Sequence, residues 1–287
     1  MAATATAGVE RFAAMGTRVE LHLFGDTHAE VLAAARRAVE AVDDALTIHR
    51  PSAATALNAV LLGAGIAAID DDILFEALVA ADEAHAATFG LFDIAADLRS
   101  GATWNRVTLD RGARTIGAAR PLALDFGGIG KGLALDRASA VLRGAGVPSA
   151  LLTAGESSIA VVGDHPLGGA WPFSIPHPLA DDESLATVDL SDDATGRRAL
   201  SISATIGRGA TAPERMALVH PGRRVAVTTP RCAVAVAASG AAAEAMSTAL
   251  MVAGPADAAR LRLDHAGPCF RFDLDAVSAA HRLGMCA

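Results

Sequence analysis

The sequence predicts an α+β fold, with mixed sheets and packed helices in one large compact unit that spans residues 1–287. Segments with the two-residue alternation of strands interleave with segments that have helical spacing, and they follow no regular βαβ count. No internal repeat and no true linker interrupts them. The chain is long enough to bury a sizeable core, either as one domain or as two closely packed halves.

The N-terminal half alternates strands and helices. Residues 17–24 alternate apolar and polar side chains as a half-buried strand does, and residues 28–46 carry apolar side chains at helical spacing. Residues 70–88 predict a second helix with aspartates as possible N-caps. Residues 105–109 and 114–116 predict short strands around a turn.

The C-terminal half is richer in strand patterns. Residues 150–153 and 159–162 are continuous apolar runs, which suit buried strands. Residues 181–198 are polar and acidic, which indicates a surface insertion or a hairpin. Residues 225–237 predict a strand, and residues 241–253 predict a helix that a Gly-Pro pair ends.

Composition narrows the class of partner. The net charge of -8, with no basic block, argues against nucleic acid as the main partner. No apolar stretch reaches membrane-spanning length, and the N-terminus lacks a signal-peptide pattern. Cys232, Cys269 and Cys286 show no CxxC or metal-ligand spacing, which fits a reducing compartment. We therefore expect a cytoplasmic protein that binds neither nucleic acid nor membrane.

Lys131, the only lysine in the chain, lies in its only dense glycine cluster, LALDFGGIGKGLALD. The segment predicts a strand, a tight turn and a helix. Glycine lets the backbone approach a ligand closely, and the amides that open a helix favour a negatively charged group such as a phosphate. The segment matches neither the Walker A pattern nor G-x-G-x-x-G. A close strand-to-helix crossing with a solvated lysine explains the same residues.

Six segments form a pattern through their order along the chain. They are Met15-Gly16-Thr17, residues 50–58 (RPSAATALN), Phe92-Asp93, residues 125–136, residues 153–163 (TAGESSIAVVG) and residues 244–255 (EAMSTALMVAGP). Together they resemble the ApbE family of FAD:protein FMN transferases. The resemblance implies an ApbE-like fold and an enzyme that binds FAD, uses Mg²⁺ at its pyrophosphate, and moves FMN onto a threonine or serine of a target protein, releasing AMP.

The resemblance also implies a metal site. Its ligands would be the backbone carbonyl of Gly130 together with Glu244, Ser247 and Thr248. Glu244 and Thr248 stand four residues apart, so they project from one face of a helix and could share one hard cation such as Mg²⁺. The family has aspartate at the position of Glu244. Without the resemblance, an exposed glutamate and a threonine bonded to its own helix explain the same pair.

The residues at positions that line the family's FAD pocket are spread over several segments. They are Met15, His49, Leu91, Phe92, Asp93, Asp125, Gly128, Lys131, Leu133 and Leu218. Judged alone, Met15 fits a core residue and His49, which replaces a family aromatic, fits a turn before a proline. Lys131 would steady the diphosphate, or it would form a salt bridge with Asp125.

The main departure from the family lies near residue 217. The family has a histidine where this chain has Ala217, and His220 follows three residues later. The candidate catalytic residues are therefore His220 as a shifted base, Lys131 and Asp93. A base must lie within hydrogen-bond distance of the acceptor hydroxyl. If acceptor activation is lost, the protein is an FAD pyrophosphatase or a degenerate FAD-binding protein, and a nucleotide-binding protein unrelated to flavin is a third class.

The resemblance implies an acceptor flavoprotein with the motif Asp-x-x-(Ser/Thr)-Gly-Ala-Thr. This chain itself contains DLRSGAT, which ends at Thr103, so self-flavinylation at Thr103 is conceivable. Chance occurrence in a chain rich in these small residues is the alternative.

Overall fold

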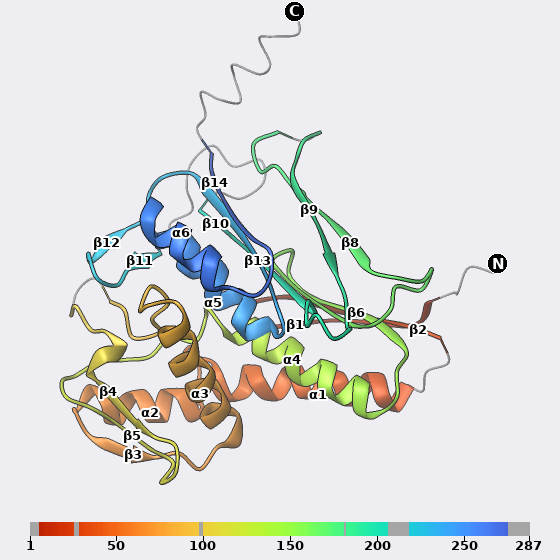
Figure 1. The fold of residues 1–287 in the computed structure, drawn as a ribbon. Coiled ribbons are helices and arrows are strands. Elements are labelled where there is room, and N and C mark those ends of the chain that lie inside the picture. The colour runs from red at the N-terminus through yellow and green to blue at the C-terminus, as the bar shows by residue number, and fades with distance from the viewer. Residues whose placement is uncertain (1–5, 26–28, 98–99, 181, 206–217, 275–287) are drawn as a thin grey trace, which may run out of the picture.

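A seven-stranded sheet forms the centre of the protein (Figure 1). The structure, a computed structural model, describes residues 6–25, 29–97, 100–180, 182–205 and 218–274. In their order across the sheet the strands are β1 (Thr6–Ala14), β2 (Thr17–Phe24), β6 (Ser149–Ala154), β7 (Ser158–Gly163), β10 (Ala199–Ala204), β13 (Arg231–Ala237) and β14 (Cys269–Asp273). Each neighbouring pair in this sheet is antiparallel.

Both faces of the large sheet are covered. One face packs on three helices, α1 (Ala29–Leu46), α4 (Gly130–Gly144) and α5 (Gly240–Val252). The other packs on the antiparallel hairpin of β8 (Trp171–Pro176) and β9 (Ser184–Leu190). Side chains on β13 alternate between the two cores, which is why the residues of this strand read as an uninterrupted apolar run.

A second group of elements lies at the lower left of Figure 1, beside α1. It contains α2 (Ala53–Leu62), α3 (Asp72–Ala87), the short 3₁₀ helix η1 (Trp104–Arg106), and a three-stranded sheet in the order β3 (Ile66–Ala68), β5 (Thr115–Ala118) and β4 (Val107–Asp110). The remaining elements are the two-stranded hairpin of β11 (Val219–His220) and β12 (Val225–Ala226), and α6 (Pro255–Asp264).

The α+β prediction is confirmed, and most predicted elements are present at or near their predicted bounds. One boundary was wrong, and the strand expected before the glycine turn is not formed, since residues 121–126 are irregular. The single strand expected over residues 225–237 is divided into β12 and β13, because Pro230 lies between them and has no N–H to donate to a neighbouring strand. The Gly-Pro pair follows the end of α5 as predicted, but Pro255 also begins α6, where a missing N–H is tolerated.

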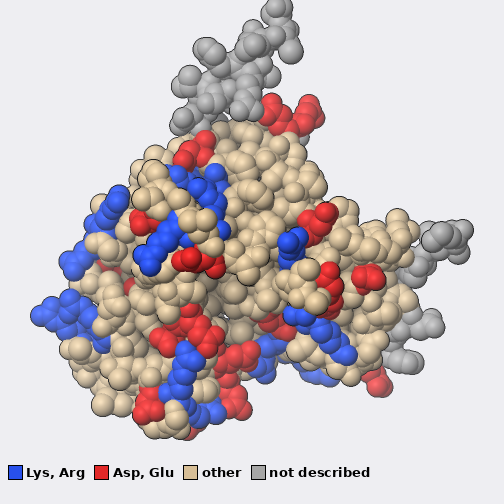
Figure 2. Space-filling view, viewed as in Figure 1, with Lys and Arg blue, Asp and Glu red and all other residues tan. Residues whose placement is uncertain are grey.

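Charged side chains of both signs lie interleaved on the face drawn in Figure 2. Within the part of the chain that the structure describes, no helix combines the length and the apolar composition that crossing a bilayer requires.

Candidate functional site

A cavity of about 700 Å³ lies where the end of β10 and the β6–β7 turn meet the middle of α5 and the start of α4. Nine residues of the predicted site line it: Leu91, Phe92, Asp93, Asp125, Gly128, Lys131, Leu218, Glu244 and Thr248. Further lining residues are Glu156 and Ser157, from the pattern segment 153–163, together with Ile175, Pro176, Ser201 and Ser203. Residues from distant parts of the chain therefore line one cavity.

Glu244 is the most connected side chain of this wall, and only 3% of the residue is exposed. Its Oε2 accepts a hydrogen bond from the backbone N–H of Gly132 at 2.8 Å, and its Oε1 accepts one from the hydroxyl of Ser158 at 2.6 Å. The ammonium of Lys131 lies 3.0 Å from the same Oε1. Burying a carboxylate is costly unless it is paired and hydrogen-bonded, and these three donors meet that need.

The ion-pair partner expected for Lys131 changes with this geometry. Its ion-pair partner is Glu244 on α5, whereas Asp125 uses its Oδ1 to accept the backbone N–H of Gly127 at 2.8 Å. The Glu244 carboxylate also accepts the N–H of Gly132, one of the amides in the first turn of α4.

Ser247 and Thr248 follow Glu244 on α5 but have different surroundings. The Ser247 hydroxyl is fully buried and lies 3.0 Å from the hydroxyl of Ser201 and 2.8 Å from that of Ser203. It joins α5 to β10 and does not line the cavity. Thr248 does line it, on the same side of α5 as Glu244.

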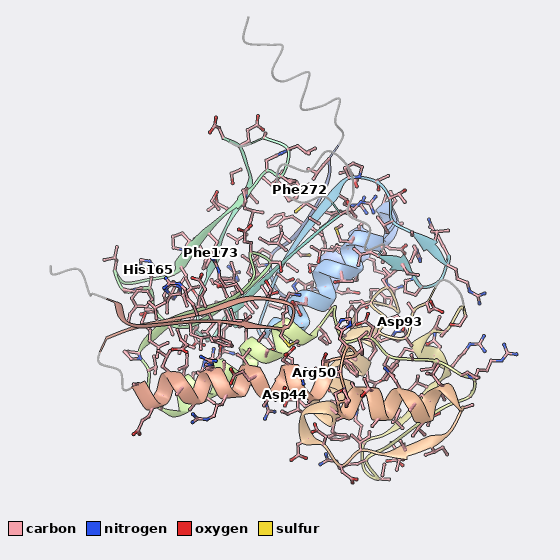
Figure 3. The ribbon with its side chains drawn as sticks, turned by 180° about the vertical axis from the view of Figure 1, so that it is seen from behind. Asp44, Arg50, Asp93, His165, Phe173 and Phe272 are labelled. Atoms are coloured by element: carbon pink, nitrogen blue, oxygen red, sulfur yellow. The ribbon has the colours of Figure 1, made fainter. Side chains whose placement is uncertain are left out.

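The segment that carries Phe92 and Asp93 forms the opposite wall and is held by a polar network. Asp93, labelled in Figure 3 beside α5, accepts backbone N–H groups of Trp104 at 2.9 Å and of Ala95 at 2.8 Å. Burial raises the pKa of the Asp93 carboxyl against the lowering effect of these amides. His85 lies 3.1 Å from the carbonyl of Phe92. These contacts give the wall a defined shape.

The glycine turn before α4 is held by Asn58, which belongs to the pattern segment 50–58. The side-chain amide of Asn58 donates to the carbonyl of Leu124 at 2.9 Å, and its oxygen accepts the N–H of Leu124 at 2.8 Å. A side chain at Gly128 would have its Cβ 3.2 Å from the Phe92 ring and 3.9 Å from the Thr248 hydroxyl. Glycine here keeps the space between the two walls open.

Met15, His49, Gly130 and Leu133 do not line the cavity. Met15 lies against the start of α4, because a Cβ at Gly130 would be 2.7 Å from its Cε. The backbone N–H of Met15 donates to Asp43, and Asp43 also pairs with Arg50, the residue after the exposed His49. Met15, Gly130 and the loop of His49 thus gather at the end of α1. Leu133 is buried in the core under α4.

A sequence model of the ApbE family matches residues 94–267, which is more than half of the chain. The chain belongs to the ApbE family. Three solved ApbE structures share its fold. The flavin transferase of Vibrio cholerae has a TM-score of 0.78 at 16% identity and 94% coverage of both chains. The flavinyl transferase of Pseudomonas stutzeri has a TM-score of 0.77 at 19% identity and covers 95% of this chain and 93% of its own.

The third, an ApbE protein of Thermotoga maritima, has a TM-score of 0.76 at 16% identity and covers 95% of this chain and 98% of its own. A search of curated proteins found no match. The three structures confirm the predicted ApbE fold.

The ApbE pattern has a histidine where this chain has Ala217, which lies outside the described residues. His220, three residues later, is the candidate replacement. His220 is buried and does not line the cavity, although its neighbours Leu218 and Val219 do. Its Nδ1 accepts the backbone N–H of Arg223 at 3.3 Å. Burial, together with the charge of Arg223, lowers the pKa of His220. The imidazole is therefore neutral at pH 7, but it lies behind the cavity wall.

Of the acceptor-like segment of this ApbE protein, residue 97 and residues 100–103 are described, and residues 98 and 99 lie outside the described part. The carboxylate of Asp97 accepts the N–H of Ser100 at 2.7 Å. Gly101 has a φ of +62°, and a Cβ there would be 2.5 Å from the Arg224 guanidinium carbon. Thr103 is partly exposed and does not line the cavity. Asp97 and Gly101 of this segment therefore each have a structural role in the fold.

The two cysteines that the structure describes, Cys232 and Cys269, are free and buried. Cys232 lines the cavity, but burial raises the pKa of its thiol to about 11. A thiol that stays protonated at neutral pH is a poor nucleophile.

Asp136, the aspartate that follows the glycine segment in the ApbE pattern, makes folding stability depend on pH. Burial raises its pKa to about 6 from 3.8, against the lowering effect of the N–H groups of Ala241 and Gly240. Folding therefore favours the protonated form. We expect the free energy of unfolding to fall, by on the order of 2 kcal/mol, as the pH rises from about 4 to about 6.

Urea unfolding of the wild type and Asp136→Asn at pH 4.5 and pH 7 checks this expectation. The variant should lose part of the pH dependence, and Asp71→Asn, which alters the N-cap of α3, should keep it. An equal pH dependence in wild type and Asp136→Asn would contradict the assignment.

Proposed function

We propose that the protein is an FAD:protein FMN transferase, which moves FMN from FAD to a threonine or serine of an acceptor protein and releases AMP. One observation carries the proposal: Lys131, Glu244 and Thr248 line the same cavity as Phe92 and Asp93 in a chain of the ApbE family. The titles of two of the solved relatives name flavin and flavinyl transferases. The cavity also has the size of small-molecule sites in proteins.

In the proposed reaction the acceptor hydroxyl oxygen bonds to the FMN-side phosphorus of FAD. The bond between this phosphorus and the bridging oxygen breaks, AMP leaves with that oxygen, and the hydroxyl proton passes to a base. The Lys131 ammonium would lie against the diphosphate and offset its charge, while Leu91, Phe92 and Leu218 offer an apolar wall to the flavin. FAD and the acceptor hydroxyl thus yield an FMN ester and AMP.

The residues present fit a hard divalent cation. Glu244 and Thr248 offer a carboxylate and a hydroxyl to one cavity, and Gly130 offers a backbone carbonyl at the start of α4. No group of three or more His, Cys, Asp or Glu side chains that could hold a metal ion occurs among the described residues, so the proposed site has a single carboxylate. We propose Mg²⁺ at Glu244 and Thr248, where it would neutralise charge on the diphosphate, with the carbonyl of Gly130, which is not part of the cavity lining, as the further ligand that the family resemblance implies. Ser247, which the resemblance adds to this set, does not line the cavity.

The proton acceptor is proposed to be Asp93, because it lines the cavity and His220 does not. Asp93→Asn should lower kcat for FMN transfer by about 10²-fold or more, whereas His220→Gln should change it less than about 3-fold. Transfer to a peptide with the acceptor motif measures both, with FAD affinity and melting temperature as checks on folding. A large loss of kcat in His220→Gln with FAD binding intact would instead assign the base to His220.

Incubation with FAD and Mg²⁺, with and without a peptide bearing Asp-x-x-Thr-Gly-Ala-Thr, tests the proposed function. Transfer predicts AMP and a fluorescent peptide in equal amounts. AMP without a fluorescent peptide would mean FAD hydrolysis, and FAD binding without AMP would mean a binding protein. Peptide recognition, a cytoplasmic location and self-flavinylation at Thr103 stay predictions. Added FMN mass that disappears in Thr103→Ala would support self-modification, and its absence in the wild type would end that idea.

A further inference from the structure

Helices α4 and α5 touch at their first turns. A Cβ at Gly132 would lie 2.2 Å from the carbonyl carbon of Gly240, and one at Gly240 would lie 2.5 Å from the carbonyl oxygen of Gly132. Each of these glycines belongs to the first turn of its helix. The two helix N-termini therefore meet backbone to backbone beside the cavity wall.

Each helix supplies a carboxylate to the first turn of the other. Glu244 of α5 accepts the N–H of Gly132 at 2.8 Å. Asp136 of α4 accepts the N–H of Gly240 at 2.6 Å and that of Ala241 at 3.0 Å. First-turn amides have no partner within their own helix, and the helix dipole favours a negative charge beside them. The two carboxylates thus bind the helices to each other in both directions.

The ordinary N-cap of α5 is a different residue. Ser239 accepts the N–H of Ala242 at 3.2 Å through its own hydroxyl. Asp136 is therefore not needed to start the helix. Its distinct contribution is to fix where α5 begins relative to α4, and so where Glu244, one turn along, meets Lys131.

We propose that Asp136 is a positioning residue for the proposed flavin transfer, because it holds α5 where Glu244 and Thr248 face the cavity and the Lys131 of α4. This inference rests on the proposed function. Asp136 is itself absent from the cavity lining, so it acts through α5 and not on FAD. In metal sites, residues that do not touch the metal but hold its ligands in place have a comparable role. Their loss typically weakens metal binding about 10–100-fold.

The test compares Asp136→Asn with Ser239→Ala, a matched control that removes a cap from the same helix and leaves the tie to α4. The affinity of the FAD-free protein for Mg²⁺ is measured by calorimetry, FAD affinity by fluorescence quenching, and kcat and KM by AMP release. Asp136→Asn should weaken Mg²⁺ binding at least about 10-fold and FAD binding about 5-fold, and Ser239→Ala should change each less than about 3-fold. Asp136→Glu, which keeps the charge with one more methylene, should be intermediate.

Unchanged Mg²⁺ and FAD affinity in folded Asp136→Asn would overturn the proposal, and so would equal losses in Ser239→Ala. If Asp136→Asn does not fold, Asp136→Glu carries the same comparison, and wild-type affinity in that variant would count against the positioning role. A wild-type protein that binds FAD but takes up no Mg²⁺ and releases no AMP would contradict the proposed function alone. The FAD affinities of the variants would then still decide the role of Asp136.

Discussion

Replacing Glu244 with glutamine is expected to lower Mg²⁺-dependent AMP release from FAD by at least about 10²-fold while FAD binding persists. The reason is that Glu244 offers the one carboxylate of the proposed cation site and also pairs with Lys131 at 3.0 Å. Glutamine keeps an oxygen for the N–H of Gly132 but has no charge to hold a cation. AMP release at saturating FAD, with a titration of Mg²⁺, measures the loss.

Two variants sharpen this expectation. Glu244→Asp restores the residue type of the ApbE pattern and should keep metal-dependent turnover, although its shorter side chain lengthens the contact to Gly132. Ser158→Ala removes the 2.6 Å hydrogen bond to Oε1 but no charge, so it should have a smaller effect than Glu244→Gln. Wild-type turnover in Glu244→Gln would remove Glu244 from the site.

A methyl group at Gly132 should lower folding stability by at least about 3 kcal/mol. Its Cβ would lie 2.2 Å from the carbonyl carbon of Gly240 and 2.6 Å from the amide nitrogen of Ala241. These are backbone atoms, which cannot move aside by changing rotamer. Gly132→Ala can therefore be accommodated only if α4 and α5 separate. Urea unfolding measures the change.

Gly144→Ala is the matched control on the same helix. A Cβ there meets nothing within 4 Å, so alanine should raise stability by up to about 1 kcal/mol through its better helix propensity. If Gly132→Ala were as stable as the wild type, the two helices would not be in backbone contact at this point.

Local patterns made much of this fold predictable. The spacing of Glu244 and Thr248 depends only on helix geometry, and the bounds predicted for β2 and α1 follow from side-chain periodicity. By contrast, β8 (WPFSIP) carries two prolines that conceal a strand, and α2 begins with a capping box that uses Thr55 in place of glutamate or glutamine.

The contacts that shape the site were less accessible, since they join residues distant in sequence. Ser158 lies in the pattern segment 153–163, and no local pattern indicates that its hydroxyl donates to Glu244. Likewise, Asp125 was the expected ion-pair partner of Lys131 because a local sequence pattern indicates contacts only between residues that are close in sequence. Lys131 pairs with Glu244 because of the way α4 and α5 cross, and tertiary packing determines that crossing.

Lys131 carries the only side-chain amine of the chain, and 23% of that side chain is exposed. Reductive methylation with ¹³C-formaldehyde would therefore give a single lysine NMR signal, apart from any signal of the N-terminal amine, without any engineered label. That signal arises 3.0 Å from Glu244 in the wall of the cavity. The protein thus contains its own spectroscopic reporter of what enters the site.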